Sequence, residues 1–183
     1  MTSRRILFGV LTVVAILLVA SIIYVFYKPA PQPSISEQMA LTSDDLGLSW
    51  TSVVTPDQYS DDVCYIRVVN DTYEAITTLF VFDNISECER WFLNASGIIS
   101  LPIMTVLNIT LGDEAILCYI GPSDEPQVHL MFAKDNIGYS IIAGNFIPDG
   151  YKGKPWWIDT TIWIAQLQLE KIDQYLAQHP EAN

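Results

Sequence analysis

The chain has 183 residues, with 21 acidic and 9 basic side chains, which gives a formal charge of −12 at pH 7. Half of the residues are hydrophobic and only 16% are charged, and this composition excludes a disordered acidic tail. A nucleic-acid backbone would repel so acidic a protein, so nucleic acid is excluded as a partner. The length accommodates one domain with a short appended segment.

An uncharged stretch near the start predicts a membrane anchor. Residues 6–27 contain no charged side chain, and as a helix these 22 residues would measure about 33 Å, enough for a hydrocarbon core of about 30 Å. Arg4 and Arg5 precede the stretch and only Lys28 follows closely, so the positive-inside rule places residues 1–5 in the cytoplasm. We expect a single-pass protein of the plasma membrane, with the lipid bilayer as one partner and an extracytoplasmic C-terminal domain.

Two other interpretations of the stretch remain open. A cleaved signal peptide would use Val19, Ala20 and Ser21 as its cleavage site, but the apolar run continues to Tyr27. A buried core helix would be expected to show a polar face, which this stretch lacks. The uncleaved signal-anchor therefore fits best.

The remaining chain divides into a stalk, a domain and a tail. Residues 28–36 are rich in proline and predict a semi-rigid stalk. Residues 37–177 predict one extracytoplasmic domain, and residues 178–183 a flexible tail. All 21 acidic residues but only 7 of the 9 basic ones follow residue 27, so this outer part carries −14.

Four asparagines stand in Asn-x-Ser/Thr sequons: Asn70, Asn84, Asn94 and Asn108. With seven Asn in the chain, chance predicts about one sequon. All four lie on the predicted outer side, where glycosylation takes place. They are candidate glycosylation sites, with coincidence as the alternative.

The first half of the domain predicts one or two short helical turns, three strands and a helix. Residues 36–46 are expected to be helical up to Gly47, and the β-rich runs 50–55, 63–69 and 73–82 to be strands, the last two forming a hairpin. Ser86 followed by Glu89 has the pattern of a capping box, so we expect a helix from Ser86 to Gly97.

The second half predicts four strands and a long helix. The strands are expected at 105–111, 115–120, 127–133 and 137–143, with a hairpin turn at Asp135 and Asn136. An apolar stripe at helical spacing predicts one long amphipathic helix that covers a sheet. Its members are Ile158, Ile162, Ala165, Leu169, Ile172 and Leu176.

This order of elements predicts an α+β fold: an N-terminal transmembrane helix followed by one α/β sandwich domain with a mostly antiparallel sheet and a long C-terminal helix. The chain resembles extracytoplasmic PsbP-like α/β sandwich domains and the sensor-like lipoprotein domains related to them. The segments that carry this resemblance are 41–50, 82–87, 112–115 and 133–138, within residues 38–176. It implies a binding, sensing or assembly module, and it carries over no catalytic residue.

Few residues offer catalytic or metal-binding chemistry. His129 in an apolar strand is expected to be structural, and His179 near the end to be exposed. No nucleotide-binding, zinc or nucleophile-elbow motif occurs, so we expect no enzyme, no cofactor and no metal. The acidic pairs beginning at Asp44, Asp61, Asp113 and Asp124 fit turns and helix caps better than calcium ligands.

The three cysteines leave two alternatives open. A bridge between Cys64 and Cys118 would close a loop of about 55 residues and stabilise the fold by roughly 4 kcal/mol. Three buried free thiols, Cys88 included, fit equally well.

A turn-rich segment, residues 148–157, contains three aromatic side chains, Tyr151, Trp156 and Trp157. They could form a contact loop for a glycan or a protein. The favoured alternative is that Trp157 anchors the final helix in the core and that the loop only connects.

The sequence leaves three functions open. The first is a membrane-anchored, non-catalytic domain that binds or senses an unknown surface ligand or partner. The second is a structural or assembly subunit of an envelope protein complex, and the third, least favoured, is a hydrolase with an unrecognised site.

Overall fold

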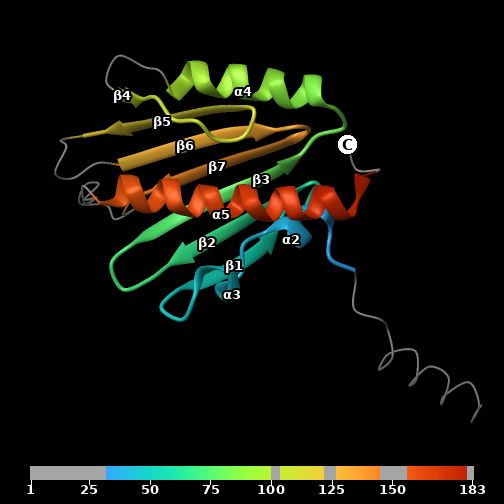
Figure 1. Cartoon of the computed structure of the whole chain (residues 1–183), viewed down its shortest axis with the longest axis horizontal. Helices are drawn as coiled ribbons and strands as arrows, with labels where there is room; N and C mark the ends of the chain where they lie inside the picture. The colour runs from blue at the N-terminus through green and yellow to red at the C-terminus, as the bar shows by residue number, and fades with distance from the viewer. Residues whose placement is uncertain (1–31, 100–103, 122–126, 145–155, 181–183) are drawn as a thin grey trace, which may run out of the picture. The chain divides into compact units, whose positions relative to one another are not determined.

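The computed structural model describes residues 32–99, 104–121, 127–144 and 156–180. Within these residues the protein is an α+β sandwich built on a seven-stranded antiparallel sheet, ordered β1-β2-β3-β7-β6-β5-β4 (Figure 1). The strands are β1 (Thr51–Pro56), β2 (Val63–Val69), β3 (Glu74–Val81), β4 (Met104–Leu107), β5 (Glu114–Ile120), β6 (Gln127–Lys134) and β7 (Ile137–Ala143). The predicted fold class is confirmed for this domain.

The sheet consists of two meanders that meet at its centre. Strands β1 to β3 form one meander and β4 to β7 the other, and β3 pairs with β7 between them. Both predicted hairpins are confirmed. In the β6–β7 turn, Asp135 takes a left-handed φ of 52°, and the Asp113 carboxylate accepts a hydrogen bond from its backbone N–H at 2.8 Å.

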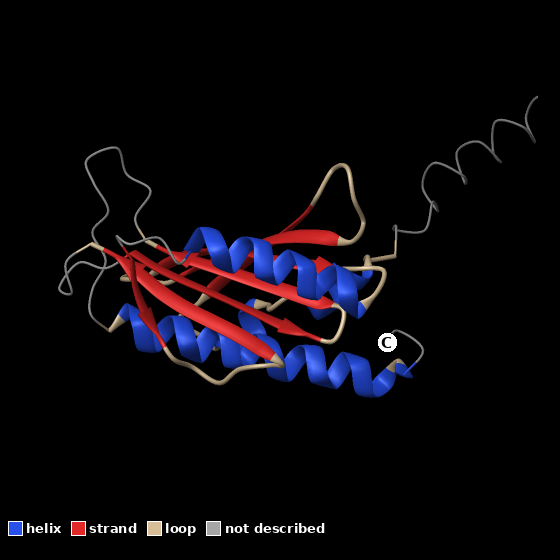
Figure 2. Ribbon diagram, turned by 90° about the horizontal axis from the view of Figure 1, so that it is seen from above, coloured by secondary structure: helices blue, strands red, loops and turns tan. Residues whose placement is uncertain are grey.

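The two long helices lie on opposite faces of the sheet, as Figure 2 shows. Helix α4 (Ile85–Ile99) links β3 at the centre to β4 at the far edge and packs on β6 and β7 as it crosses. Helix α5 (Trp157–Gln178) packs on β6 and β7 from the other face. The short helices α2 (Ile35–Met39) and α3 (Ser43–Leu46) lie beside α5, with α2 over β1 to β3.

The folded unit begins earlier than predicted. The Ser34 hydroxyl accepts a hydrogen bond from Glu37 N, and the Glu37 carboxylate accepts one from Ser34 N at 2.8 Å, which together form a capping box for α2. Ser36, predicted to belong to the stalk, is completely buried. The compact unit that contains the sheet extends from Pro33 to Asn183.

Helix α4 begins at a different residue from the one predicted. Asn84 rather than Ser86 caps it, because Asn84 Oδ1 accepts the Glu87 N–H at 3.0 Å and Ser86 lies inside the first turn. The helix also continues past Gly97 to Ile99. An Asn side chain one residue before the helix competes successfully with Ser for the first free N–H groups.

The buried stripe of α5 is rotated relative to the prediction. Ala165, Ile172 and Leu176 are buried as expected, whereas Ile158, Ile162 and Leu169 are only half-buried. The other buried positions are Trp157, Thr161, Ile164 and Gln168. Two of these are polar, and each has a partner: Thr161 Oγ1 lies 2.9 Å from the Tyr73 hydroxyl, and Gln168 Nε2 donates to the Met39 carbonyl at 2.7 Å.

None of the helices in the described ranges is long and apolar enough to cross a membrane. The predicted anchor at residues 6–27 lies outside the described residues.

Candidate binding surfaces

One half of the α4 side of the sheet has no described helix over it. We call this surface, formed by the outward side chains of β1, β2 and β3, the open face. Its residues are Thr51, Val53, Thr55, Val63, Tyr65, Arg67, Val69, Glu74, Ile76 and Thr78, whereas Phe80 at the end of β3 packs against Trp91 of α4. The face is open because α4 crosses only the half of the sheet between β3 and β4.

Apolar side chains on the open face are exposed to solvent. Val53 is 49% exposed, Tyr65 42% and Ile76 39%. Val53 and Ile76 both flank Arg67 in one cross-strand row. Such a group of exposed apolar residues on one surface is typical of interaction sites.

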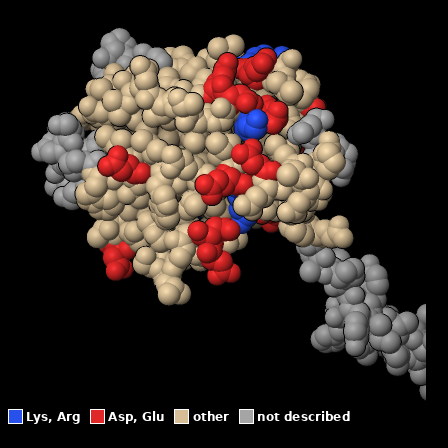
Figure 3. All heavy atoms as spheres, in the orientation of Figure 1, with Lys and Arg blue, Asp and Glu red and all other residues tan. Residues whose placement is uncertain are grey.

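The open face is electrically balanced, although the protein is strongly acidic. Arg67 Nη2 lies 2.8 Å from Glu74 Oε1, and these are its only charged members. At the rim, a hydrogen bond to the Asp57 carboxylate raises the pKa of Tyr65. Acidic side chains instead gather on part of the opposite, α5-bearing face, as Figure 3 shows. A partner could therefore dock on the open face without burying an unpaired charge.

The edge of β1 is blocked for strand pairing near both of its ends. Ser52 N donates a hydrogen bond to Ser43 Oγ at 2.8 Å, and Ser52 Oγ donates to the Leu41 carbonyl at 2.6 Å. Pro56 ends the strand without an N–H donor. Contact with a partner is therefore expected through side chains of the face rather than by strand addition at this edge.

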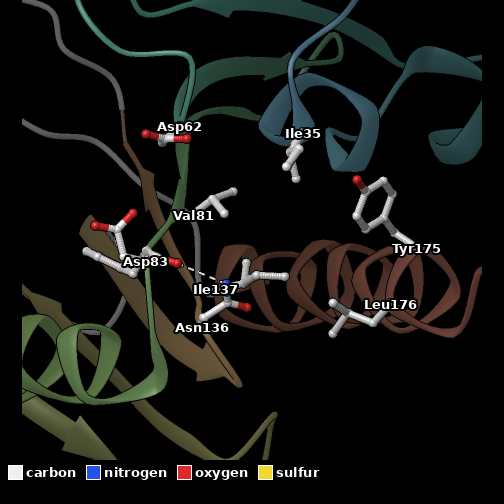
Figure 4. A pocket seen from close by; sticks show the side chains of 9 residues that line it. Ile35, Asp62, Val81, Asp83, Asn136, Ile137, Tyr175 and Leu176 are labelled. Atoms are coloured by element: carbon white, nitrogen blue, oxygen red, sulfur yellow. Dashed lines mark hydrogen bonds between the residues drawn. The ribbon is translucent and has the colours of Figure 1, made fainter. Parts of the chain in front are cut away.

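A small hollow lies where β3, the β6–β7 turn and the end of α5 meet (Figure 4). Its volume is about 210 Å³, and Asp62, Asp83, Asn136 and Tyr175 supply its polar groups. Asn136 Nδ2 donates to the Phe82 carbonyl at 2.9 Å, while its Oδ1 is buried without a partner among the described residues. Ligand pockets usually measure about 300–1,000 Å³, so this hollow is small for a metabolite.

The hollow also contains the two carboxylates of Asp62 and Asp83. A glycosidase-type hydrolase site built on two carboxylates would need one of them held protonated, for example by an apolar enclosure. Both side chains are exposed, so their surroundings provide no enclosure of that kind. The arrangement adds no argument for a hydrolase.

The four sequons occupy different parts of the surface. Asn84, Asn94 and Asn108 are exposed and lie before, on and beyond α4. Asn70, in the β2–β3 turn, is half-buried, and its Oδ1 accepts the Thr72 and Tyr73 N–H groups. None of the four lies on the open face.

The structure contains three buried free thiols, the second of the two alternatives for the cysteines. Cys64 and Cys118 lie on opposite faces of the sheet and four strands apart, about 19 Å, so no bridge between them can form. Burial raises the pKa of Cys64 and Cys118 to about 11 and that of Cys88 to about 12. A thiol with so high a pKa is a poor nucleophile at neutral pH.

The histidines differ from the prediction in detail. His129 is half-buried and burial lowers its pKa, but its Nε2 has no partner among the described residues. His179 is not fully exposed, since its ring stacks on Tyr175 with centroids 4.3 Å apart.

Only part of the predicted contact loop can be assessed, because Tyr151 lies outside the described residues. Trp157 is 5% exposed and packs edge-on against Tyr73 in the core, so its role as an anchor is confirmed and a contact role is not available to it. Trp156 is 42% exposed and remains a candidate contact residue.

Two of the acidic pairs have structural partners. Asp45 accepts hydrogen bonds from Thr42 and pairs with Lys171, and Asp113 bonds the β6–β7 turn. No group of three potential metal-ligating side chains occurs in the described part of the chain.

Comparison with known proteins gives no match to a family model, a curated protein or a solved structure.

Proposed function

We propose that this protein is a membrane-anchored, extracytoplasmic domain that binds a protein partner through its open face and performs no catalysis. The observation that carries the proposal is the uncovered half of the sheet, with Val53, Tyr65 and Ile76 exposed together. Covering these side chains would remove apolar surface from water at about 25 cal/mol per Å².

A protein partner fits the open face better than a small ligand does. The face is broad and lies on strands of a rigid sheet, whereas the hollow at Asn136 is smaller than most ligand sites. The open face contains an exposed tyrosine, Tyr65, and a central arginine, Arg67, and both residue types are enriched in protein interfaces. The PsbP-like resemblance also favours a binding or assembly module.

The sequence supports the placement outside the membrane. The uncharged stretch 6–27 is followed by a short proline-rich segment, and the folded unit begins at Pro33. A domain attached so closely to a bilayer would meet its partners at the membrane surface. The open face would then belong to a receptor-like module or to a subunit of an envelope assembly.

Site-specific photo-crosslinking tests the proposal in full-length protein within sealed native cells. A photoreactive residue at position 76, on the open face, should yield a discrete adduct with another protein. The matched control is position 174, where Gln174 is exposed on α5. Equal adduct yields from both positions, or none from position 76, would remove the open face as a docking surface.

Two further results test whether the partner is a second copy of the chain and whether the domain is extracytoplasmic. An adduct of twice the chain's own mass would identify a second copy and contradict a different partner. Protease added to sealed cells should digest the domain, and complete protection would contradict its extracytoplasmic placement.

A further inference from the structure

A groove of about 370 Å³ lies between the C-terminal half of α4 and strands β4 and β5. Two aliphatic side chains in its lining are unusually exposed, Leu93 at 66% and Val106 at 46%. Phe92 and Ile116, also in the lining, belong to the apolar cluster beneath α4. The groove therefore exposes two aliphatic side chains to water beside polar groups such as Asn108, on a side of the molecule separate from the α5 face.

Gly97 adds a second observation at the same groove. It lies inside α4, where Gly is less favourable than Ala by about 1 kcal/mol. No described atom lies within 4 Å of the position that a Cβ would occupy, and no left-handed φ requires glycine. Neither packing nor backbone geometry among the described residues accounts for it, whereas close approach by a group outside the polypeptide would.

A sequon residue forms part of the same lining. Asn108 is exposed, lines the groove and begins Asn-Ile-Thr. Asn94, the first residue of Asn-Ala-Ser, follows Leu93 directly on α4 and is also exposed. The two other sequons lie elsewhere: Asn84 precedes Leu93 by nine residues, about 14 Å along a helix, and Asn70 lies in the β2–β3 turn.

We propose that Asn108 carries an N-linked glycan that lies over this groove, with Asn94 as a second attachment point at its rim. The proposal depends on the predicted extracytoplasmic placement but not on the open face. The C–H faces of the first sugars would cover Leu93 and Val106, and their hydroxyl groups would face water. The missing Cβ of Gly97 leaves room for the sugar ring beside the helix.

The attachment needs a lipid-phosphate-linked oligosaccharide as co-reactant. Asn108 Nδ2 attacks the anomeric carbon, a C–N bond forms, and the C–O bond to the lipid phosphate breaks. The amide nitrogen loses one proton, and the lipid phosphate leaves with the bonding electron pair. The Thr110 hydroxyl is the group that the sequon requires.

Glycopeptide mass spectrometry of the full-length protein, isolated from a host that glycosylates exported proteins, tests the attachment. Asn108 should carry sugar, and both Asn108→Gln and Thr110→Ala should lose that one modification. Sugar on Asn84 or Asn70 with none on Asn108 would overturn the proposal, and so would a protein with no sugar at all.

Binding of an apolar fluorescent dye tests the covering of the groove. Asn108→Gln should raise dye fluorescence above that of the glycosylated wild type, because Leu93 and Val106 become accessible. Ser86→Ala is the matched control, because it removes the sequon at Asn84, far from the groove, but keeps the Asn84 cap of α4, and it should leave the fluorescence unchanged. Adding Leu93→Ala to Asn108→Gln should reverse the increase, and equal signals from Asn108→Gln and Ser86→Ala would show that the glycan does not cover the groove.

Discussion

The two sides of the sheet differ in how much helix covers them. On the α5 side, α5 packs on β6 and β7 while α2 packs on β1, β2 and β3, and the side chains between them form the main core. On the α4 side, α4 covers β6 and β7 and contacts Phe80 of β3, whereas most outward residues of β1 to β3 remain in contact with water. The same alternating strands thus produce a closed core on one side and a partly exposed surface on the other.

This difference follows from the order of the elements along the chain. The connection from β3 to β4 must cross β7, β6 and β5, because β4 lies at the far edge of the sheet. Helix α4 therefore covers that half, whereas β1, β2 and β3 follow one another through short turns that place nothing above them. Stability measurements on matched pairs of variants can test whether the two sides differ as their packing indicates.

The largest expected change in the free energy of unfolding is on the α5 side of the sheet, where the core is closed. Ile164→Ala removes a completely buried side chain of α5, and it should lower the free energy of unfolding by about 3 kcal/mol. Leu93→Ala on the outer surface of α4 is the matched change at a 66% exposed position, and it should stay within about 0.5 kcal/mol of wild type. Urea unfolding measures both, and similar losses would mean that the two helices are equally buried.

The second-largest expected change in stability tests how closely α4 packs against the half of the sheet that it covers. A Cβ on Gly138 of β7 would lie 2.7 Å from the Trp91 ring, so Gly138→Ala should destabilise by about 1–3 kcal/mol. Gly97→Ala on α4 should instead leave the unglycosylated protein unchanged or stabilise it by up to about 1 kcal/mol. Thermal unfolding distinguishes the two, and a neutral Gly138→Ala would show that α4 is loosely packed.

The third effect concerns the polar contact within the closed core. Thr161→Val leaves the Tyr73 hydroxyl buried without its 2.9 Å partner and should destabilise by about 1–2 kcal/mol. Thr160→Val is the control, because its hydroxyl bonds only the Trp156 carbonyl near the surface. If Thr161→Val unfolds at the same denaturant concentration as Thr160→Val, the buried hydrogen bond contributes nothing.

The smallest effect is at the rim of the closed side, where Asp45 of α3 pairs with Lys171 of α5. Partial burial acts to raise the pKa of Asp45, but hydrogen bonds from Lys171 and Thr42 outweigh it and hold the pKa below the ordinary 3.8. The ionised form therefore stabilises the fold, by roughly 0.5 kcal/mol at such an exposed position. This contribution is present above about pH 4 and is lost as the pH falls through the lowered pKa.

Stability measured from pH 7 down to pH 2 checks this contribution. The difference between wild type and Asp45→Asn should be constant near neutral pH and should vanish in acid. Asp44→Asn, at the neighbouring exposed residue, provides the control. A difference that grew with acid would reverse the inferred sign.

Most of the local structure could be predicted from short-range patterns. The runs that became β2 and β7 are rich in β-branched and aromatic residues, and each is bounded by turn residues, so their strand state follows from the residues alone. The candidate site could not be predicted in this way. Tyr65 and Ile76 occupy outward-facing positions of their strands, and a second helix could equally have covered them. No pattern in the neighbouring residues indicates whether a helix covers that part of the sheet.

The structure corrects the predicted N-cap of α4 and the predicted buried stripe of α5, and both corrections have a common physical cause. Both Asn84 and Ser86 are good N-caps, and only the position at which the chain leaves β3 decides between them. Thr161 and Gln168 are polar, so the apolar stripe omitted them; they are buried because Tyr73 and the Met39 carbonyl, distant in sequence, meet them in the core.

By itself, the sequence determined the elements, their antiparallel hairpins, the acidic character of the domain and the positions of its sequons, because each of these depends on neighbouring residues or on composition. Only the tertiary structure decided which half of the sheet stays uncovered, that Cys64 and Cys118 lie too far apart to bond, and that Asn108 borders the groove in which Leu93 and Val106 are exposed. These properties depend on the pairing of β3 with β7 and on the path of α4, which bring together residues distant in the chain.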